Sequence, residues 1–415
     1  MPRIIADLHV HSKYSRATSK EMDVTVLDKW AKIKGIDLLG TGDFTHPAYY
    51  AELLEKLEPA GNGLFRLKDK PDSVHFMLTT ELNHIYSDKG KTRRVHMLIF
   101  APSFQVVEKI TASLSGWGNL ASDGRPILKF SVKQLVKMVL DISDACMVIP
   151  AHIWTPWYSL LGDQSGYDSL EEAFDEWTPS IRAVETGLSS DPAMNWRLST
   201  LDDVTLISNS DAHSPSKLGR EANLFDCEMD YQTITEILRT KDRRRFLKTV
   251  EFFPEEGKYH YDGHRNCDVL FSPKETKEHR GTCPVCGRPV TIGVMHRVDA
   301  LADRAQGFSP DQPISFVRLV PLQEIIAEAL GLGAETAGVA REYERLIEKG
   351  GSEFCILLDL SGEELTTFVP GKILEGILRV REGNVHIRPG YDGLYGEVKI
   401  FGGQENREES QMALF

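Results

Sequence analysis

The 415-residue sequence has no apolar run near the length of about 20 residues that a membrane-spanning helix needs. Its first residues also lack the charged segment followed by an apolar segment that is typical of a secretion signal. These absences argue against an integral-membrane protein. We therefore expect a cytoplasmic protein with no membrane partner.

The chain also lacks an excess of positive charge. Its 61 acidic residues outnumber its 48 lysines and arginines, and the formal net charge is −13. This balance argues against a surface coated by nucleic acid, although a locally basic groove remains compatible with it. Hydrophobic residues make up 41% and charged residues 26%, which is ordinary for a globular chain long enough for two or three domains.

Cysteine is scarce, with six residues in the whole chain. Three of them cluster, at Cys267, Cys283 and Cys286, and the other three are scattered in apolar or mixed surroundings. In a reducing compartment the cluster indicates metal binding, and the scattered cysteines indicate buried thiols.

Residues 1 to about 250 alternate between short apolar runs and amphipathic stretches. The runs predicted as strands after Ile4–Ala6 are Ile36–Gly40, His75–Thr80, Val95–Phe100, Met147–Pro150, Ile181–Glu185 and Val204–Ser208. The predicted helices between them include Val24–Lys34, Tyr49–Leu57, Val132–Leu140 and Tyr231–Leu238. This alternation predicts a parallel α/β sheet or barrel. In such barrels the active-site residues lie where strands end and loops begin.

Histidines and carboxylates gather at the ends of these strands. His9 and His11 share one face of the first strand, and we expect Asp7 on the same face to orient the first ring. Later strand termini carry Asp43 with His46, Glu81, His96, His152, and Asp211 with His213. Any one of these residues alone would be explained as a loop group or helix cap. Six coincidences predict a polynuclear metal site that mixes imidazole and carboxylate ligands.

As a set, these motifs resemble the PHP (polymerase and histidinol phosphatase) family of metallo-phosphoesterases. The resemblance implies an α/β fold with a distorted (βα)7-like barrel. It also implies two or three divalent ions (zinc, manganese or magnesium), with the ligands His9, His11, Asp43, Glu81, His96, His152, Asp211 and His213. One departure is Phe44, which stands where the family commonly has histidine, and His46 is a candidate substitute.

Four of these residues are the candidate catalytic group: His9, His11, Glu81 and Asp211. Two neighbouring cations would clamp the attacking and leaving oxygens of a phosphodiester and lower the pKa of a bound water. Glu81 is suited to bridge two metals. For Asp211 the sequence leaves two roles open, metal ligand or general base.

Two further groups are candidates for DNA contact. Trp154, Trp157 and Tyr158 follow His152 and could hold an unstacked base, although burial in the core is an equally good explanation. The basic run 241–248 contains Arg243, Arg244 and Arg245, which suit phosphate contacts or form a solvated face. A polar loop over residues 116–126 is long enough to line a substrate path.

A Cys-x-x-Cys knuckle at Cys283 and Cys286 indicates a closed zinc site, because its turn lets both sulfurs face one tetrahedral metal. The partner half is His264-x-x-Cys267, with His260 and His296 as alternatives for the fourth ligand. We expect such a site to fold a small module and to take no part in catalysis.

After residue 300 the pattern becomes helical, at Val320–Leu330 and Glu335–Lys349, and a polar tail follows from about residue 403. We predict four regions: a barrel (1–252), a zinc-binding module (253–299), a mostly helical C-terminal domain (300–402) and a flexible tail (403–415). In the tail, Gln411, Leu414 and Phe415 resemble a bacterial sliding-clamp binding peptide. The alternative is a hydrophobic terminus that packs back on the domain.

The order of barrel, zinc module and helical region resembles the endonuclease Q family of DNA-repair enzymes, with the closest fit at residues 257–265, 283–287 and 296–298. The resemblance implies hydrolysis on the 5′ side of deaminated bases (uracil, hypoxanthine, xanthine) and of abasic sites, leaving 3′-hydroxyl and 5′-phosphate ends. Two alternatives are a small-molecule phosphatase of histidinol-phosphate type and a non-catalytic DNA-binding scaffold.

Overall fold

The structure is a computed structural model that describes residues 3–402. Its first strand, β1 (Arg3–Asp7), is buried from Ile4 onward, as expected for a strand covered on both faces. β1 pairs in parallel with β2 (Leu38–Gly40) and antiparallel with β11 (Ala222–Asp226). It therefore lies inside the sheet, and His9 and His11 follow directly from its C-terminal end.

The main sheet has 11 strands in the order β15–β12–β11–β1–β2–β5–β4–β3, with β6, β7 and β8 attached through β5 and β6. Its other strands are β3 (Leu57–Gly61), β4 (Leu64–Leu67), β5 (His75–Asp88), β6 (Lys91–Ala101), β7 (Ile127–Leu128), β8 (Met147–Pro150), β12 (Phe246–Glu251) and β15 (Ser315–Arg318). β9 (Ala183–Glu185) and β10 (Thr205–Ile207) form a separate parallel pair. A parallel bridge between Val10 and Ala212 joins the loop after β10 to the end of β1, which brings the strands round into a distorted barrel.

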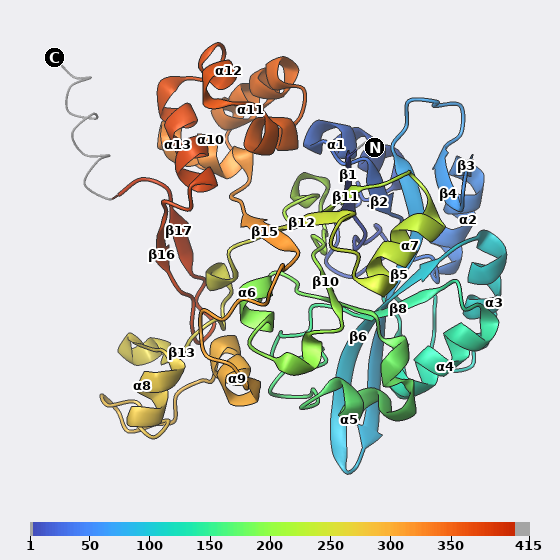
Figure 1. Ribbon diagram of the computed structural model, residues 1–415, viewed down its shortest axis with the longest axis horizontal. Helices are drawn as coiled ribbons and strands as arrows, with labels where there is room; N and C mark the ends of the chain where they lie inside the picture. Colours follow the sequence, from blue (N-terminus) through green and yellow to red (C-terminus); the bar gives the residue numbers. More distant parts are fainter. Residues whose placement is uncertain (1–2, 403–415) are drawn as a thin grey trace.

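Helices surround the barrel strands (Figure 1). They are α1 (Val24–Lys34), α2 (Pro47–Lys56), α3 (Phe104–Leu114), α4 (Val132–Ile142), α5 (Leu170–Phe174), α6 (Pro192–Asn195) and α7 (Tyr231–Thr240). Local signals set their ends: Asp23 caps the start of α1, and Gly35 ends it with φ of 84°. Ser131 and Gln134 form a capping box at the start of α4.

The strands β5 and β6 differ from the expected parallel alternation. They form one long antiparallel hairpin, in which Lys89 and Gly90 both have positive φ values, 47° and 77°, as in the tight turns that favour hairpins. Because both strands continue past the barrel edge, Glu81 and His96 lie within strands and not at strand ends. In this hairpin Glu81 is paired with Leu98, and Asn83 with His96. Because paired residues and residues two apart on one strand share a face of the sheet, Glu81 and His96 project from the same face and both reach the site.

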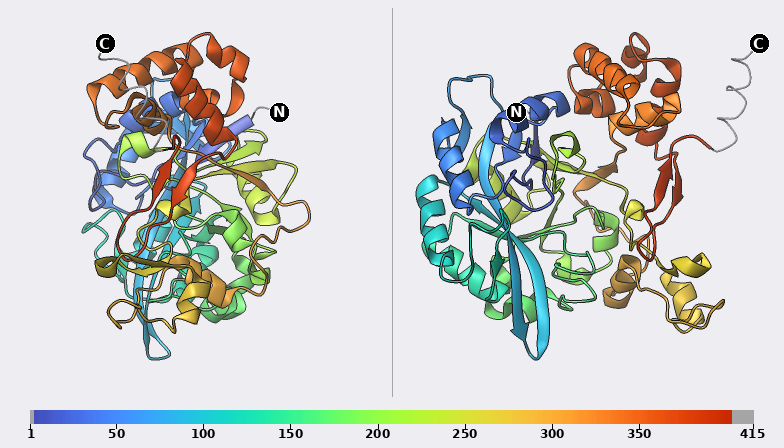
Figure 2. Two further views of the ribbon diagram at one scale, coloured as in Figure 1. Left: turned by 90° about the vertical axis from the view of Figure 1, so that its left-hand side faces the viewer. Right: turned by 180° about the vertical axis from the view of Figure 1, so that it is seen from behind.

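Two smaller regions follow the barrel (Figures 1 and 2). The first contains β13 (Asp262–His264), β14 (Val269–Phe271), α8 (Pro273–Glu278) and α9 (Val294–Leu301). The second contains α10 (Leu322–Leu330), α11 (Ala337–Gly350), α12 (Gly362–Thr366) and α13 (Gly371–Arg381). The hairpin of β16 (His386–Arg388) and β17 (Glu397–Lys399) leaves these helices and returns to the first region, where the Tyr261 N–H donates to the Gly390 carbonyl at 3.0 Å. The predicted α/β fold class with a helical C-terminal region is confirmed.

The C-terminal helices contact the barrel through a buried ion pair. Lys34 at the end of α1 lies 2.6 Å from Glu353, which also accepts a hydrogen bond from the Tyr343 hydroxyl at 2.5 Å. Between residues 3 and 402 the helices are all too short or too polar to cross a membrane.

Candidate metal centre

Four side chains from three parts of the barrel meet beyond the end of β1. His9 and His11 come from the segment after β1, Glu81 from β5, and Asp211 from the loop after β10. One ligand atom of each lies within 4.8 Å of the others. The two histidines and Glu81 are 0–1% exposed, so the group forms a preorganised site shielded from bulk water.

A second group adjoins the first and shares one carboxylate with it. Glu81, His96 and His152 also bring their ligand atoms within 4.8 Å of one another. Glu81 Oε2 lies 3.2 Å from His11 Nε2, whereas its Oε1 lies 2.7 Å from His96 Nδ1 and 3.0 Å from His152 Nε2. Each oxygen of Glu81 thus faces a different group, which is the arrangement of a bridging carboxylate.

Unsatisfied polar atoms support a cation in this cluster. His9 Nε2, His11 Nε2, His96 Nε2 and Asp211 Oδ1 are buried and have no hydrogen-bond partner within residues 3–402. Leaving a buried polar atom unpaired costs about 1–3 kcal/mol, so four at one place call for an explanation. A set of neutral imidazoles and carboxylates suits divalent ions, and these residues therefore fit a divalent metal centre.

Glu185, at the end of β9, fixes the ring of His9. Its carboxylate lies 3.0 Å from His9 Nδ1 and accepts hydrogen bonds from the His152 backbone N–H at 2.9 Å and from Asn209 at 2.9 Å. This contact leaves His9 Nε2 directed at the cluster. Our sequence reasoning missed Glu185, although its place at the end of a predicted strand was a usable signal.

The prediction that Asp7 orients His9 is wrong. Its two oxygens accept hydrogen bonds from the backbone N–H groups of Ser210 and Gly219, each at 3.0 Å. Burial raises the pKa of Asp7 to about 6. Asp7 therefore fixes the loop that carries Asp211.

Two further predicted ligands, Asp43 and His213, and the candidate substitute His46 lie outside both groups. Asp43 is used as an orienting residue: one oxygen lies 3.1 Å from His11 Nδ1, and the other accepts from the Ser12 backbone and hydroxyl at 2.6 Å each. His213 packs its ring 4.5 Å from that of His11 and keeps its Nδ1 at 2.9 Å from the Asp211 carbonyl. His46 caps helix α2 by accepting from the Tyr49 N–H, so it does not replace the histidine absent at Phe44.

The carboxylates set the charge state of the cluster. Burial lowers the pKa of His9, but Glu185, Asp211 and Glu81 outweigh it and hold this pKa well above its usual value. At His96 burial prevails and lowers the pKa to about 4. In the opposite sense, burial would raise the pKa of Glu81, yet neighbouring cationic groups hold it well below its ordinary value. The carboxylate of Glu81 is therefore kept ionised, as metal binding requires.

The three aromatic residues after His152 occupy different places. Trp154 is 1% exposed, and its indole N–H donates to Asn195 at 2.8 Å, so the prediction that it contacts DNA is wrong. Trp157 is 42% exposed and packs edge-on against Tyr259, with ring centroids 5.7 Å apart. Tyr158 lies with its ring 5.1 Å from that of His96, which places it next to the metal-ligand groups.

A cavity of about 360 Å³ opens beside these aromatic residues. It is lined by Trp157 and Tyr158 on the barrel side and by Lys258, Tyr259 and His260 on the other. Because Tyr158 borders both the cavity and His96, the cavity lies beside the ligand cluster.

The basic run lies at the wrong end of the barrel for contact with a substrate at the cluster. Asp226 pairs with Arg3 at the start of β1, and its backbone N–H donates to the Arg245 carbonyl at 2.8 Å. His9 lies six residues farther along the chain, roughly 20 Å in extended chain. Arg245 also pairs with Asp242, and Arg243 donates to the Asp311 carbonyl at 3.0 Å. The prediction that Arg243, Arg244 and Arg245 contact DNA phosphates stays a prediction, and their position places such contacts away from the cluster.

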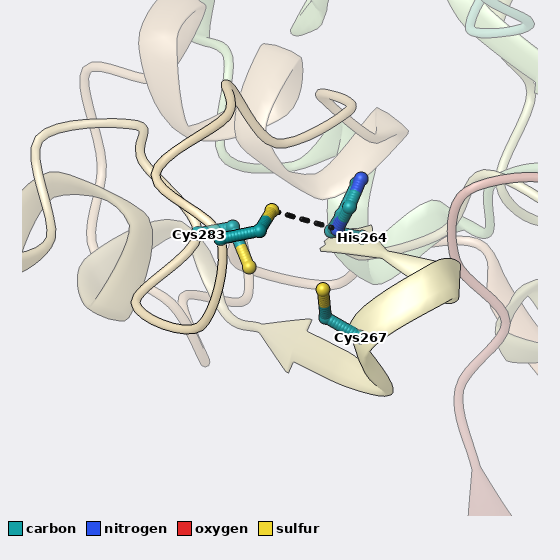
Figure 3. A group of neighbouring side chains, drawn as sticks. His264, Cys267 and Cys283 are labelled. Carbon is teal, nitrogen blue, oxygen red and sulfur yellow. Dashed lines mark hydrogen bonds between the residues drawn. The ribbon is translucent and has the colours of Figure 1, made fainter.

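A separate group of three sulfurs and one imidazole lies in the region after the barrel. His264, Cys267, Cys283 and Cys286 place their ligand atoms within 4.8 Å of one another, and Figure 3 shows the first three pointing toward a common centre. Burial raises the pKa of Cys283, but backbone N–H groups of its loop outweigh this and lower it to about 7, which favours the thiolate that binds metal.

The two alternative histidines do not join this group. His296 Nδ1 lies 2.7 Å from Asp262, and the ring of His260 stacks on Tyr261 with centroids 5.1 Å apart. The four-residue set predicted from the spacing of the knuckle is therefore the one that the fold brings together.

A barrel with two adjoining groups of histidine and carboxylate ligands at one edge defines a metal-dependent phosphoesterase. The chain is 31% identical to the lesion-specific endonuclease PfuEndoQ of Pyrococcus furiosus, with a TM-score of 0.86 over 100% of this chain and 99% of that one. It is 32% identical to an endonuclease Q solved with a 27-mer duplex that carries an abasic lesion at the active site, with a TM-score of 0.83 over 96% and 97% of the two chains. The chain belongs to the endonuclease Q family.

Two relatives and one family model extend this comparison. YqxK of Bacillus subtilis, described as uncharacterized, is 31% identical over 96% of this chain and 100% of its own length. MJ0043 of Methanocaldococcus jannaschii, described in the same way, is 32% identical over 60% of this chain but only 31% of its own length. The model of the MJ0043 C-terminal domain matches residues 321–384, which hold the helices α10 to α13.

Proposed function

We propose that this protein is a metal-dependent DNA-repair endonuclease that hydrolyses the phosphodiester on the 5′ side of a damaged nucleotide. Its substrates are deaminated bases (uracil, hypoxanthine, xanthine) and abasic sites, and its products carry 3′-hydroxyl and 5′-phosphate ends. The observation that carries the proposal is the pair of ligand groups sharing Glu81, in a chain that matches endonuclease Q over its full length.

Divalent ions (zinc, manganese or magnesium) are held in this proposal by His9, His11, Glu81 and Asp211 in one group and by Glu81, His96 and His152 in the other. Bound ions would polarise the phosphate and lower the pKa of a water molecule. Asp211 is a ligand here, because its buried Oδ1 is directed into the first group. Glu185 and Asp43 hold His9 and His11 in the ligating orientation.

A structural zinc ion in the Cys₃His group would hold the region after the barrel in place as one wall of the cavity beside Trp157. Lys258, Tyr259 and His260 line that cavity and directly precede β13, which carries His264. The cytoplasmic location inferred from the sequence stays a prediction.

The cavity beside Trp157 is the proposed site for an extruded base. Enzymes that act on one nucleotide of a duplex take it out of the stack, and a deaminated or mispaired base costs less to unstack. The exposed faces of Trp157 and Tyr259 offer the stacking surface, and the volume of about 360 Å³ is ample for one base. Tyr158 then lies between the base and His96.

Trp157→Ala tests the cavity. Stacking on an aromatic ring is worth about 1–3 kcal/mol per base, so incision of a uracil-containing duplex should fall by about 5- to 150-fold. Incision at an abasic site, which has no base to stack, should change by less than about threefold. Leu54→Ala removes an equally exposed apolar side chain (42%) from α2 and should leave the ratio of the two rates unchanged. Equal losses on both substrates for Trp157→Ala would contradict the assignment.

The function itself is tested by incubating the protein and a divalent metal with labelled duplexes that contain uracil, an abasic site or no lesion. A lesion-dependent single-strand break is expected. A small-molecule phosphatase would leave all three duplexes intact, and so would a non-catalytic DNA-binding scaffold, which would still shift them in a gel.

The proposed protein partner is the bacterial sliding clamp. The predicted binding residues Gln411, Leu414 and Phe415 lie outside the described residues, and the proposal rests on their sequence pattern. Affinity should be modest, roughly micromolar, because ordering a flexible peptide offsets part of its contact energy. Titration of the clamp should show binding by the full chain and none by a chain ending at Ser410. Equal binding by the two chains would remove this hypothesis.

A further inference from the structure

The guanidinium group of Arg125 lies among the metal-ligand groups. Its Nη1 donates to Glu81 Oε2 at 3.0 Å, and its side chain is only 22% exposed. The same oxygen of Glu81 faces His11 and His9, at 3.2 and 3.6 Å. An arginine side chain stays charged at every physiological pH, so the cluster contains a permanent cation.

The backbone around Arg125 is fixed against the same cluster. The Arg125 N–H donates to the Asp123 side chain at 3.0 Å, and the Gly124 N–H donates to the Tyr14 carbonyl at 3.1 Å. A Cβ at Gly124 would approach Asp43 Oδ2 to 2.2 Å, so only glycine allows this approach. The loop thus rests on the carboxylate that orients His11, and it presents Arg125 to the cluster in a defined position.

A permanent cation beside ligands that attract metal ions has a cost. It repels those ions and weakens their binding unless an anion shares the site. A guanidinium group has the planar fork of donors that matches two oxygens of a phosphate group.

We propose that Arg125 is a further catalytic residue, which binds the non-bridging oxygens of the scissile phosphate. It would then exchange its contact with Glu81 for a contact with the substrate. This inference rests on the proposed function only in requiring a phosphodiester substrate. During hydrolysis the oxygen of water bonds to phosphorus and the P–O3′ bond breaks. The water loses one proton, the leaving O3′ gains one, and Arg125 stabilises the charge on the phosphoryl oxygens.

The test compares Arg125→Ala and Arg125→Lys with Arg66→Ala, a control on β4 whose side chain pairs with Glu58 at 2.9 Å. Each protein, loaded with manganese, is assayed on an abasic duplex and on the small diester bis(p-nitrophenyl) phosphate. Metal content and the affinity for inorganic phosphate are measured in parallel. Removing one preorganised donor typically costs about 10²–10³ in kcat, and we expect that loss for Arg125→Ala and a smaller loss for Arg125→Lys.

Phosphate affinity should fall with Arg125→Ala while metal content stays equal to that of the unmutated protein. A kcat within threefold of normal would overturn the proposal, and so would a loss of metal that matches the loss of activity. If the unmutated protein cleaves only the small diester, the proposed function fails, but the diester and phosphate measurements still decide the role of Arg125.

Discussion

His9→Ala is expected to reduce incision of an abasic duplex by about 10³-fold or more, with DNA affinity changed by only a few-fold. His9 contributes one of the buried ring nitrogens that lack a hydrogen-bond partner in residues 3–402, and its loss opens the first ligand group. A bound metal ion provides several kcal/mol of charge stabilisation in the transition state, and each 1.36 kcal/mol changes the rate about tenfold. Incision rate and gel-shift affinity are measured on the same protein preparation.

His75→Ala is the matched control for this experiment. His75 is the first residue of β5 and precedes Glu81 on that strand by six residues. Its replacement should therefore leave incision near normal. Asp211→Ala should reproduce the loss seen with His9→Ala. Full activity in either cluster variant, with metal at saturation, would refute the ligand assignment.

Cys283→Ser should release one equivalent of zinc and unfold the segment that it holds. The apolar cluster at this place contains only four buried side chains, Val269, Phe271, Cys283 and Val290, which is too small a core to fold alone. Structural zinc provides about 10–16 kcal/mol of apparent binding free energy in small zinc modules, so the metal is the main source of stability there. Damaged-DNA binding should weaken because the cavity beside Trp157 loses one wall.

Cys355→Ser is the control, since Cys355 is half-buried in the C-terminal helical region and lies outside the sulfur group. Zinc is counted by elemental analysis, and the segment is probed by limited proteolysis between residues 258 and 298. Unchanged zinc content in Cys283→Ser would show that the site has been misassigned.

Short-range patterns predicted much of this site. His9 and His11 are two residues apart at the end of a strand, so strand geometry alone puts both on one face. The Cys-x-x-Cys turn likewise determines that Cys283 and Cys286 face one point, and the spacing of His264 and Cys267 supplied the other two ligands. The helix predicted from the amphipathic stretch Val24–Lys34 is α1, with the same bounds.

The errors arose where distant segments decide the outcome. Asp43 and Glu185 are both carboxylates near strand ends, and only the fold shows that they orient His11 and His9. The hairpin of β5 and β6 depends on pairing over 11 residue pairs, which an apolar run does not reveal. Arg245 lies at the far end of the barrel because β12 joins the sheet parallel to β1, through β11.

The most direct test of the central claim is the position and chemistry of the break in a duplex with one abasic site. The account predicts a single divalent-metal-dependent cut immediately 5′ to the lesion. A polymerase should extend the upstream end without processing, because it carries a 3′-hydroxyl, and a ligase should accept the 5′-phosphate of the other end. A cut on the 3′ side, an upstream end that blocks the polymerase, or equal cleavage of the undamaged duplex would contradict it.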